Sequence, residues 1–126
     1  MRKILSKHRD SFKDAFAGLW WSLKTQPNFK IHILLSILAL WGCWFFALSD
    51  LEIIIIIFAI VLGLAGEMIN TSIEAMTDLI TDKWHQKAKI AKDVSAGMML
   101  VTAFGAFFIA SIIFLPHVLD SFGFFL

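Results

Sequence analysis

The stretch IIIIIFAIVLGLAGEMINTSIEAMTD, residues 53–78, decides the fold of this chain. Its first half, residues 53–66, is an uninterrupted apolar run, which is typical of a helix that crosses a membrane. Its second half carries acidic and amide side chains where that helix leaves the bilayer. At about 100° per residue, four of them share a sector roughly 80° wide on one helical face: Glu67, Asn70, Glu74 and Asp78.

This polar face predicts a functional site at the membrane boundary. Ionisable groups at such a depth are costly, so they mark sites of function by default. A cluster of oxygen ligands without thiols suits magnesium better than zinc. The alternative is an ordinary amphipathic extension of the helix into water, in which Glu74 and Asp78 are simply solvated.

The composition indicates a small integral membrane protein with a single domain, residues 1–126. Apolar residues make up 59% of the 126 residues, whereas soluble domains are about half apolar. The formal net charge of +1 provides no basic field for nucleic acid, so no nucleic-acid partner is expected. The lone Cys43 excludes a disulfide framework or a cysteine metal site within one chain.

Hydrophobic periodicity predicts an all-α fold. Residues 4–24 are expected to form an amphipathic helix in the membrane interface, since they are too polar to span. Pro27 should end that helix. Three transmembrane helices are expected at about residues 31–48, 51–69 and 94–116, with a tight turn at Ser49 and Asp50 and a polar connection over residues 81–92.

The second of these spans is short. Only fourteen residues separate Glu52 from Glu67, which corresponds to about 21 Å of helix. The hydrocarbon layer is roughly 30 Å thick. One or both of these glutamates must therefore lie at the boundary or slightly inside it.

The distribution of lysine and arginine predicts the orientation in the membrane. Seven of these residues precede the first span, four lie between residues 81 and 92, and none lies in the 49–52 turn or after residue 92. The positive-inside rule places the N-terminus and the 81–92 connection in the cytoplasm and the C-terminus outside. The acidic face of residues 67–78 then lies on the side where ATP is available.

A second polar group, Lys89, Lys92 and Asp93, begins the third span. The preceding connection should fold it back toward Glu74 and Asp78. Carboxylates for a divalent ion and a lysine for phosphate are what catalysis of phosphoryl transfer requires. No Walker loop is present in the sequence. The alternative for these lysines is that they only extend to the cytoplasmic interface.

These residues together resemble a known family. The pattern Glu67-x-x-Asn70-Thr-Ser-x-Glu74-x-x-x-Asp78, followed by Ala91-Lys92-Asp93, is similar to that of the small prokaryotic diacylglycerol kinases. Asn28-Phe29-Lys30-Ile31-His32 resembles the Asn-Phe-Arg-Ile-His element of their Gram-positive undecaprenol kinase branch. The resemblance extends from about Phe12 to Pro116.

The resemblance implies a homotrimeric kinase of the bacterial plasma membrane that transfers the γ-phosphate of Mg-ATP to a lipid hydroxyl. By this resemblance Glu67 is the general base, Glu74 binds the metal and ATP, and Asn70 and Asp78 shape the site. Three further residues match positions that contact ATP: His85, Lys92 and Asp93.

Two positions depart from the family pattern. Gln26 stands where the family usually has a metal-binding glutamate, and an amide is a weaker, neutral ligand. Asp14 lies near a position where some relatives carry an aromatic residue thought to meet adenine.

Two functions therefore remain open. The first is a lipid kinase, for which the Asn28–His32 element favours undecaprenol as acceptor, with diacylglycerol next. The other is a non-enzymatic helical membrane protein that uses the acidic face for ion binding or assembly.

Overall fold

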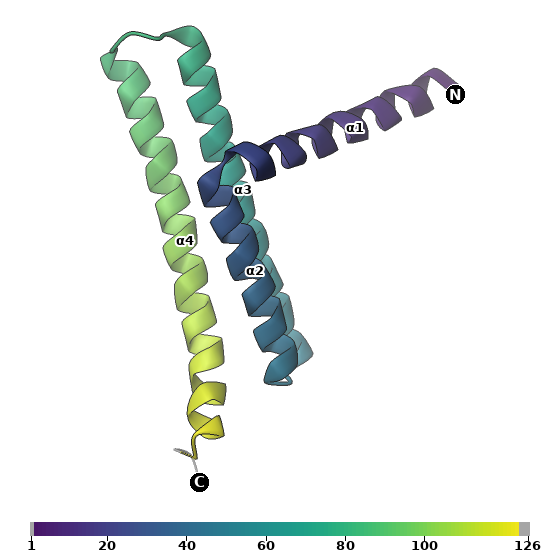
Figure 1. Cartoon of the computed structure of the whole chain (residues 1–126), viewed down its shortest axis with the longest axis vertical. Helices are drawn as coiled ribbons and strands as arrows, with labels where there is room; N and C mark the ends of the chain where they lie inside the picture. The colour runs from purple at the N-terminus through teal and green to yellow at the C-terminus, as the bar shows by residue number, and fades with distance from the viewer. Residues whose placement is uncertain (1, 124–126) are drawn as a thin grey trace.

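Four helices make up the part of the chain that a computed structural model describes, residues 2–123, with side chains from residue 8 onward. They are α1 (Arg2–Thr25), α2 (Pro27–Phe45), α3 (Asp50–Ile80) and α4 (Gln86–Ser121). Each of the last three is long and apolar enough to cross a membrane. In Figure 1, α3 and α4 form a long antiparallel hairpin and α2 lies along the lower part of α3. The predicted all-α fold with three apolar helices is confirmed.

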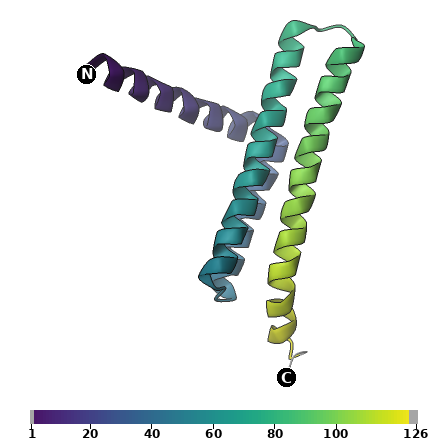
Figure 2. The same cartoon turned by 180° about the vertical axis from the view of Figure 1, so that it is seen from behind.

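The boundary between α1 and α2 lies at Gln26, whose backbone is extended, with φ −97° and ψ 110°. Pro27 begins α2, where its missing N–H costs no helical hydrogen bond. The predicted helix break is thus confirmed. Figures 1 and 2 show that α1 projects away from the other helices, so that Phe12 and Phe16 are exposed. Its location in the membrane interface stays a prediction.

The connection between α2 and α3 comes earlier than predicted. α2 ends at Phe45, and residues 46–49 form the turn, with Ala47 in the left-handed region at φ 51°. Ser49 caps α3, and in return the Ser49 backbone N–H donates to Oε2 of Glu52 at 2.8 Å. This reciprocal capping box satisfies amide groups that a helix start leaves unpaired. The expected turn at Ser49 and Asp50 was therefore placed too late, because Asp50 already belongs to α3.

The connection between α3 and α4 is shorter than predicted. It covers residues 81–85, and α4 begins at Gln86 rather than near residue 94. Residues 86–92 are mostly good helix formers, and the Lys89–Asp93 pair at i,i+4 supports the first turns. The polarity of this segment indicates that it lies outside the membrane, but the segment is helical and does not form a loop.

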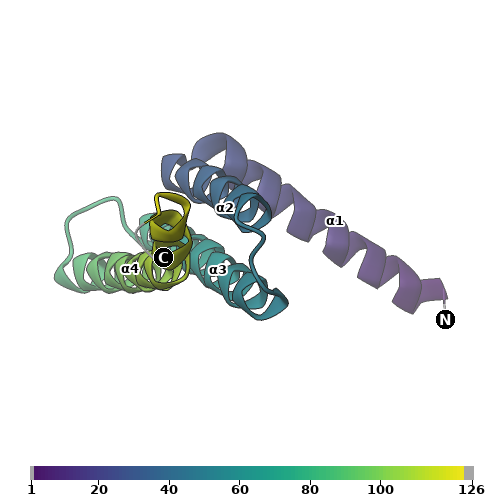
Figure 3. The same cartoon turned by 90° about the horizontal axis from the view of Figure 1, so that it is seen from below.

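Packing is concentrated on α3. Viewed from below, α2 and α4 both lie against α3 and α1 extends away (Figure 3). A Cβ atom added at Gly66 would lie 2.6 Å from Oγ1 of Thr102, so α4 approaches α3 closely at this point. At the opposite end from the α3–α4 connection, Nε2 of His117 lies 3.0 Å from Oε1 of Glu52. These contacts fix α4 against α3 near the two positions that flank the apolar run.

Candidate active site

The polar face of α3 runs from a buried end to an exposed end. Glu67 and Asn70 are only 2% and 4% exposed, Glu74 is half-buried and Asp78 is exposed. This gradient follows the helix toward the α3–α4 connection. The helix therefore presents a buried carboxylate first and increasingly accessible acidic groups beyond it.

Hydrogen bonds join the middle of this face to α4. The amide nitrogen of Asn70 donates to Oε1 of Glu74 at 3.1 Å. The hydroxyl oxygen of Ser95, on α4, lies 2.8 Å from Oδ1 of Asn70. Asn70 thus links the half-buried carboxylate to the neighbouring helix.

Glu67 lacks such support. Its Oε2 atom is enclosed and has no hydrogen-bond partner among the residues that the structure describes. A buried polar atom without a partner costs roughly 1–3 kcal/mol, and more when it is charged. An enclosed carboxylate oxygen without a partner is therefore suited to accept a hydrogen bond from a ligand.

The start of α4 folds back onto the exposed end of α3, as predicted. Nζ of Lys92 lies 2.5 Å from Oδ1 of Asp78, and Lys89 pairs with Asp93 one turn apart on α4. The side chains of Lys89, Asp93 and Asp78 are largely accessible, and that of Lys92 is partly buried. The structure thus places two lysines and two aspartates at the mouth of the site.

A charged pocket of about 320 Å³ lies where α3, the connection and α4 meet. It brings together four residues that the sequence assigned to the site. His85 caps α4, and its Nδ1 accepts the backbone N–H of Lys87 at 3.2 Å, so a neutral ring carries its hydrogen on Nε2. The predicted residues that line this pocket are Asp78, His85, Lys92 and Asp93.

Gln26 and Asp14 are separate from this hydrogen-bonded network. The side-chain amide of Gln26 donates to Oγ1 of Thr25 at 3.4 Å, beside the α1–α2 boundary. Asp14 is exposed on α1. The structure gives neither residue a bond to the polar face of α3.

The acidic face offers a partial shell for a metal ion. No group of three or more His, Cys, Asp or Glu side chains suited to a metal occurs within the described part of the chain. Magnesium usually keeps several waters and takes one or two carboxylates together with substrate phosphates. The half-buried Glu74 carboxylate, which bonds to Asn70 through one oxygen, fits that donor set.

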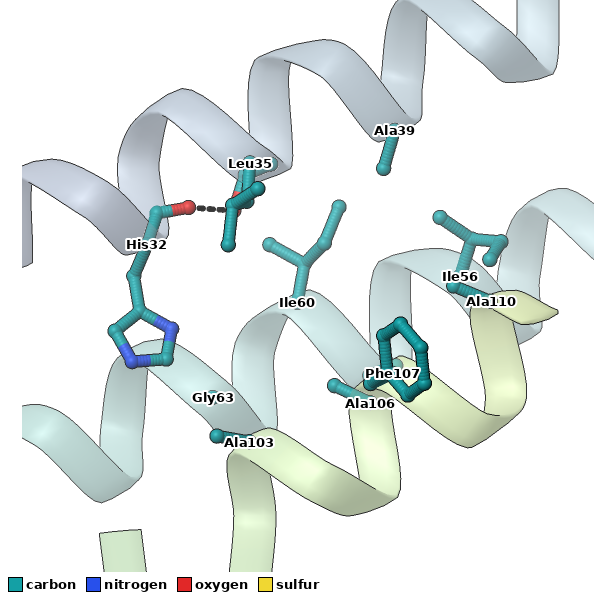
Figure 4. A pocket seen from close by; sticks show the side chains of 12 residues that line it. His32, Leu35, Ala39, Ile56, Ile60, Gly63, Ala103, Ala106, Phe107 and Ala110 are labelled. Carbon is teal, nitrogen blue, oxygen red and sulfur yellow. Dashed lines mark hydrogen bonds between the residues drawn. The ribbon is translucent and has the colours of Figure 1, made fainter. Parts of the chain in front are cut away.

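An apolar pocket of about 220 Å³ lies between α2, α3 and α4. Figure 4 shows His32 and Gly63 at one end of it and Ile56 and Ala110 at the other. Gly63 precedes Glu67 by one helical turn on α3. The pocket therefore runs along the apolar part of α3 from the side of the buried carboxylate.

Sequence reasoning missed the polar role of Ser95. The candidate residues named from the sequence do not include it. The signal available was its spacing of three residues from Lys92, which places both on one face of α4. Its partner on α3 was not evident from the sequence.

Known proteins that are similar to this chain indicate the family in which this site occurs. The model of the prokaryotic diacylglycerol kinase family matches residues 13–114, a range that contains every residue discussed above for the acidic face and the charged pocket. This chain belongs to the prokaryotic diacylglycerol kinase family. An undecaprenol kinase of Bacillus subtilis (strain 168) is 41% identical over 118 residues, which cover 91% of this chain and 94% of the relative.

A second relative is more distant. A diacylglycerol kinase of Synechocystis sp. (strain ATCC 27184 / PCC 6803 / Kazusa) is 31% identical over 111 residues, which cover 87% of this chain and 63% of the relative. The family member described here is therefore a lipid kinase, and its three apolar helices fit a multi-pass membrane protein. The non-enzymatic alternative is set aside.

Proposed function

We propose that this kinase transfers the γ-phosphate of Mg-ATP to the hydroxyl group of undecaprenol. The observation that carries the proposal is the buried Glu67, which has an unpartnered oxygen and follows Gly63 of an apolar pocket by one helical turn. A lipid alcohol has the matching shape, with a hydroxyl at the end of an apolar chain. Diacylglycerol is the second candidate acceptor.

Glu67 acts as the general base in this proposal. A base must lie within hydrogen-bond reach of the proton that it removes, and its oxygen must be available to the acceptor. Oε2 of Glu67 has that availability, since no described residue occupies it. Removal of the hydroxyl proton makes the lipid oxygen a better nucleophile toward the γ-phosphate.

Glu74 is the proposed metal ligand, together with the phosphates of ATP and with Gln26 as a weaker, neutral contributor. Bound magnesium would supply charge neutralisation at the phosphates. Asn70 holds one oxygen of Glu74 by its amide hydrogen bond, which leaves the other oxygen for the ion. Asn70 and Asp78 thus shape the site rather than react.

ATP is proposed to occupy the charged pocket at the α3–α4 connection. Lys92 supplies a point charge for phosphate, and Nε2 of His85 supplies a donor. Asp93 positions Lys89 through their ion pair. Because catalysis of phosphoryl transfer consists of positioning and electrostatic stabilisation, these groups need only hold the nucleotide in line with the acceptor.

The apolar pocket of Figure 4 is the proposed position of the first part of the acceptor chain. Its lining is almost entirely hydrocarbon, with His32 and Ser36 as its polar members. The 41% identity to the Bacillus undecaprenol kinase, over nearly all of both chains, supports undecaprenol over diacylglycerol. A tail in this pocket would place the hydroxyl toward Glu67.

The proposed setting is the bacterial plasma membrane, with the N-terminus in the cytoplasm, the C-terminus outside and α1 in the interface. A homotrimer is proposed: the number three comes from the family resemblance, and the need for a partner is supported by α4, which buries only one of its residues, Ser95, within the chain. Its many exposed apolar side chains need lipid or neighbouring subunits. Native mass spectrometry from mild detergent tests this assembly, and a monomer would contradict it.

A transfer assay tests the reaction. Purified protein is given γ-labelled ATP with undecaprenol or diacylglycerol in separate micelles, and Glu67→Gln serves as the inactive control. We expect label in both lipids, with faster transfer to undecaprenol. Equal label from the Glu67→Gln variant would contradict the role of Glu67, and faster transfer to diacylglycerol would contradict the choice of acceptor.

A further inference from the structure

Ser95 is the one residue of α4 that is buried, at 2% exposed, and it lies beside the acidic face. Its hydroxyl oxygen is 2.8 Å from Oδ1 of Asn70 and 2.9 Å from the backbone carbonyl of Lys92. The first contact joins residues that are 25 positions apart. The second is the local bond that serine commonly makes within a helix.

The hydroxyl group has a single hydrogen, so these two contacts compete for it. If Ser95 donated only to Lys92, its oxygen could still accept from the amide nitrogen of Asn70. The Asn70 amide would then be turned around, and its Oδ1 would face the Glu74 carboxylate. Two acceptors would oppose each other whenever Glu74 is ionised, which is unfavourable in a buried site.

Donation from Ser95 to Oδ1 of Asn70 removes this conflict. The amide nitrogen then donates to Oε1 of Glu74, with a donor–acceptor distance of 3.1 Å. The three side chains form a directed series in which Ser95 donates to Asn70 and Asn70 donates to Glu74. A residue without a hydroxyl at position 95 could not fix that direction.

We propose that Ser95 is a positioning residue of the kinase, which fixes the amide of Asn70 so that Glu74 is held ready for the metal. Ser95 touches neither substrate nor metal in this scheme, and it acts through Asn70. The inference rests on the proposed metal-binding role of Glu74. Hydrogen-bond partners of metal ligands typically contribute about 10–100-fold to metal affinity or activity.

The chain offers a direct spectroscopic test, because Asn28 and Asn70 are its only asparagines. Selective ¹⁵N labelling of asparagine gives two side-chain amide signals, and Asn28→Ser assigns them. We expect Ser95→Ala to shift the Asn70 signal and to speed the exchange of its hydrogens, with the Asn28 signal unchanged. Ser111→Ala is the matched control, since the Ser111 hydroxyl bonds only to the carbonyl of Phe107 on the same helix.

Metal binding provides the second measurement. We expect Ser95→Ala to weaken Mn²⁺ binding, followed by electron paramagnetic resonance without turnover, by about tenfold. In an Asn70→Ala background the same change should have no further effect on Mn²⁺ affinity, because Asn70, through which Ser95 acts, is absent. A wild-type Asn70 signal in Ser95→Ala, or an equal loss of affinity in both backgrounds, would overturn the proposal.

Two outcomes separate this inference from the proposed function. If Glu74→Ala binds Mn²⁺ as tightly as the wild type, the metal role of Glu74 fails, while the amide signal still reports whether Ser95 orients Asn70. If Ser95→Ala does not fold, Ser95→Cys keeps a similar volume with a weaker donor. We expect an intermediate shift of the Asn70 signal in Ser95→Cys, and an unshifted signal would overturn the proposal.

Discussion

The ammonium group of Lys92 lies 2.5 Å from a carboxylate oxygen of Asp78, across the connection between α3 and α4. Lys92 is the lysine that the sequence assigned to phosphate binding. In the ligand-free chain it therefore already has an anionic partner. A nucleotide that uses Lys92 must replace or share the Asp78 carboxylate.

This relationship predicts different effects for the two partners. Lys92→Met should weaken ATP binding by about 10–100-fold. This is the effect of losing a hydrogen bond to a charged group, which contributes roughly 1.5–3 kcal/mol. Asp78→Asn should change the free energy of unfolding by less than about 1 kcal/mol, since Asp78 is largely exposed and Lys92 is only partly buried. Nucleotide titration and denaturation measure these effects. Equal losses of ATP affinity in both variants would show that the pair itself, rather than Lys92, serves the nucleotide.

Glu67→Gln should lower turnover by about two to four orders of magnitude, the usual contribution of a general base. Nucleotide affinity should remain, because Glu67 lies below the charged pocket. The measurement is steady-state transfer to lipid together with nucleotide titration. Asp50→Asn, in the first turn of the same helix, is the matched control, and its turnover should stay close to that of the wild type. Near-normal turnover in Glu67→Gln would contradict its assigned role.

Glu74→Ala should abolish transfer and weaken the binding of Mg-ATP, because the triphosphate loses charge neutralisation through the ion. Chelation of magnesium in the wild type should have the same effect on transfer and should be reversible. Calorimetric titration of nucleotide and magnesium measures the affinities. Loss of turnover with unaltered affinities would count against Glu74 as a ligand.

Gln26→Glu should lower the magnesium concentration needed for half-maximal rate, since a carboxylate adds charge that an amide lacks. The wild type is expected to be active but to bind metal less tightly than relatives with glutamate at this position. Gln86→Glu, at the start of α4, controls for added charge alone. An unchanged magnesium titration in Gln26→Glu would show that this position does not face the ion.

Gly66→Ala should destabilise the protein by roughly 1–3 kcal/mol, the range for overpacking, because the new Cβ would meet Oγ1 of Thr102 at 2.6 Å. Turnover should fall as well, since Glu67 is the next residue. Thr102→Ala in the same chain should restore part of the loss by removing the hydroxyl oxygen that the new Cβ would meet. Gly97→Ala is the control, with nothing within 4 Å of its added Cβ. Unfolding in detergent measures each variant, and equal stability of Gly66→Ala and the wild type would contradict the close contact.

Much of the fold follows from the sequence because apolar runs and Pro27 act locally. Runs of sufficient length identify the three apolar helices, and a proline after an extended residue separates the first two. The ends of the helices were predicted less well. Ser49 and His85 begin helices through side-chain caps, and the residues around them carry the polarity that a loop would also show.

The candidate site, like the fold, could be predicted from the sequence only in part. The shared face of Glu67, Asn70 and Glu74 follows from helical spacing alone. The contact of Ser95 with Asn70 joins two residues that are 25 positions apart. It depends on how α3 and α4 are rotated against each other, which the spacing of residues along one helix does not determine. The short connection between the helices limits the possible partners of Lys92 to side chains at the end of α3. The structure identifies that partner as Asp78.

The carboxylate of Glu52 uses its two oxygens for different purposes. One accepts from the backbone and hydroxyl of Ser49 and completes the cap of α3, while the other meets His117 near the end of α4. Secondary and tertiary structure are thereby coupled at a single side chain. During synthesis α3 emerges before α4, so its capped end is available as a docking point when the last helix arrives. One side chain thus connects the start of α3 to the end of α4, so its loss would weaken the helix cap and this contact between the two helices together.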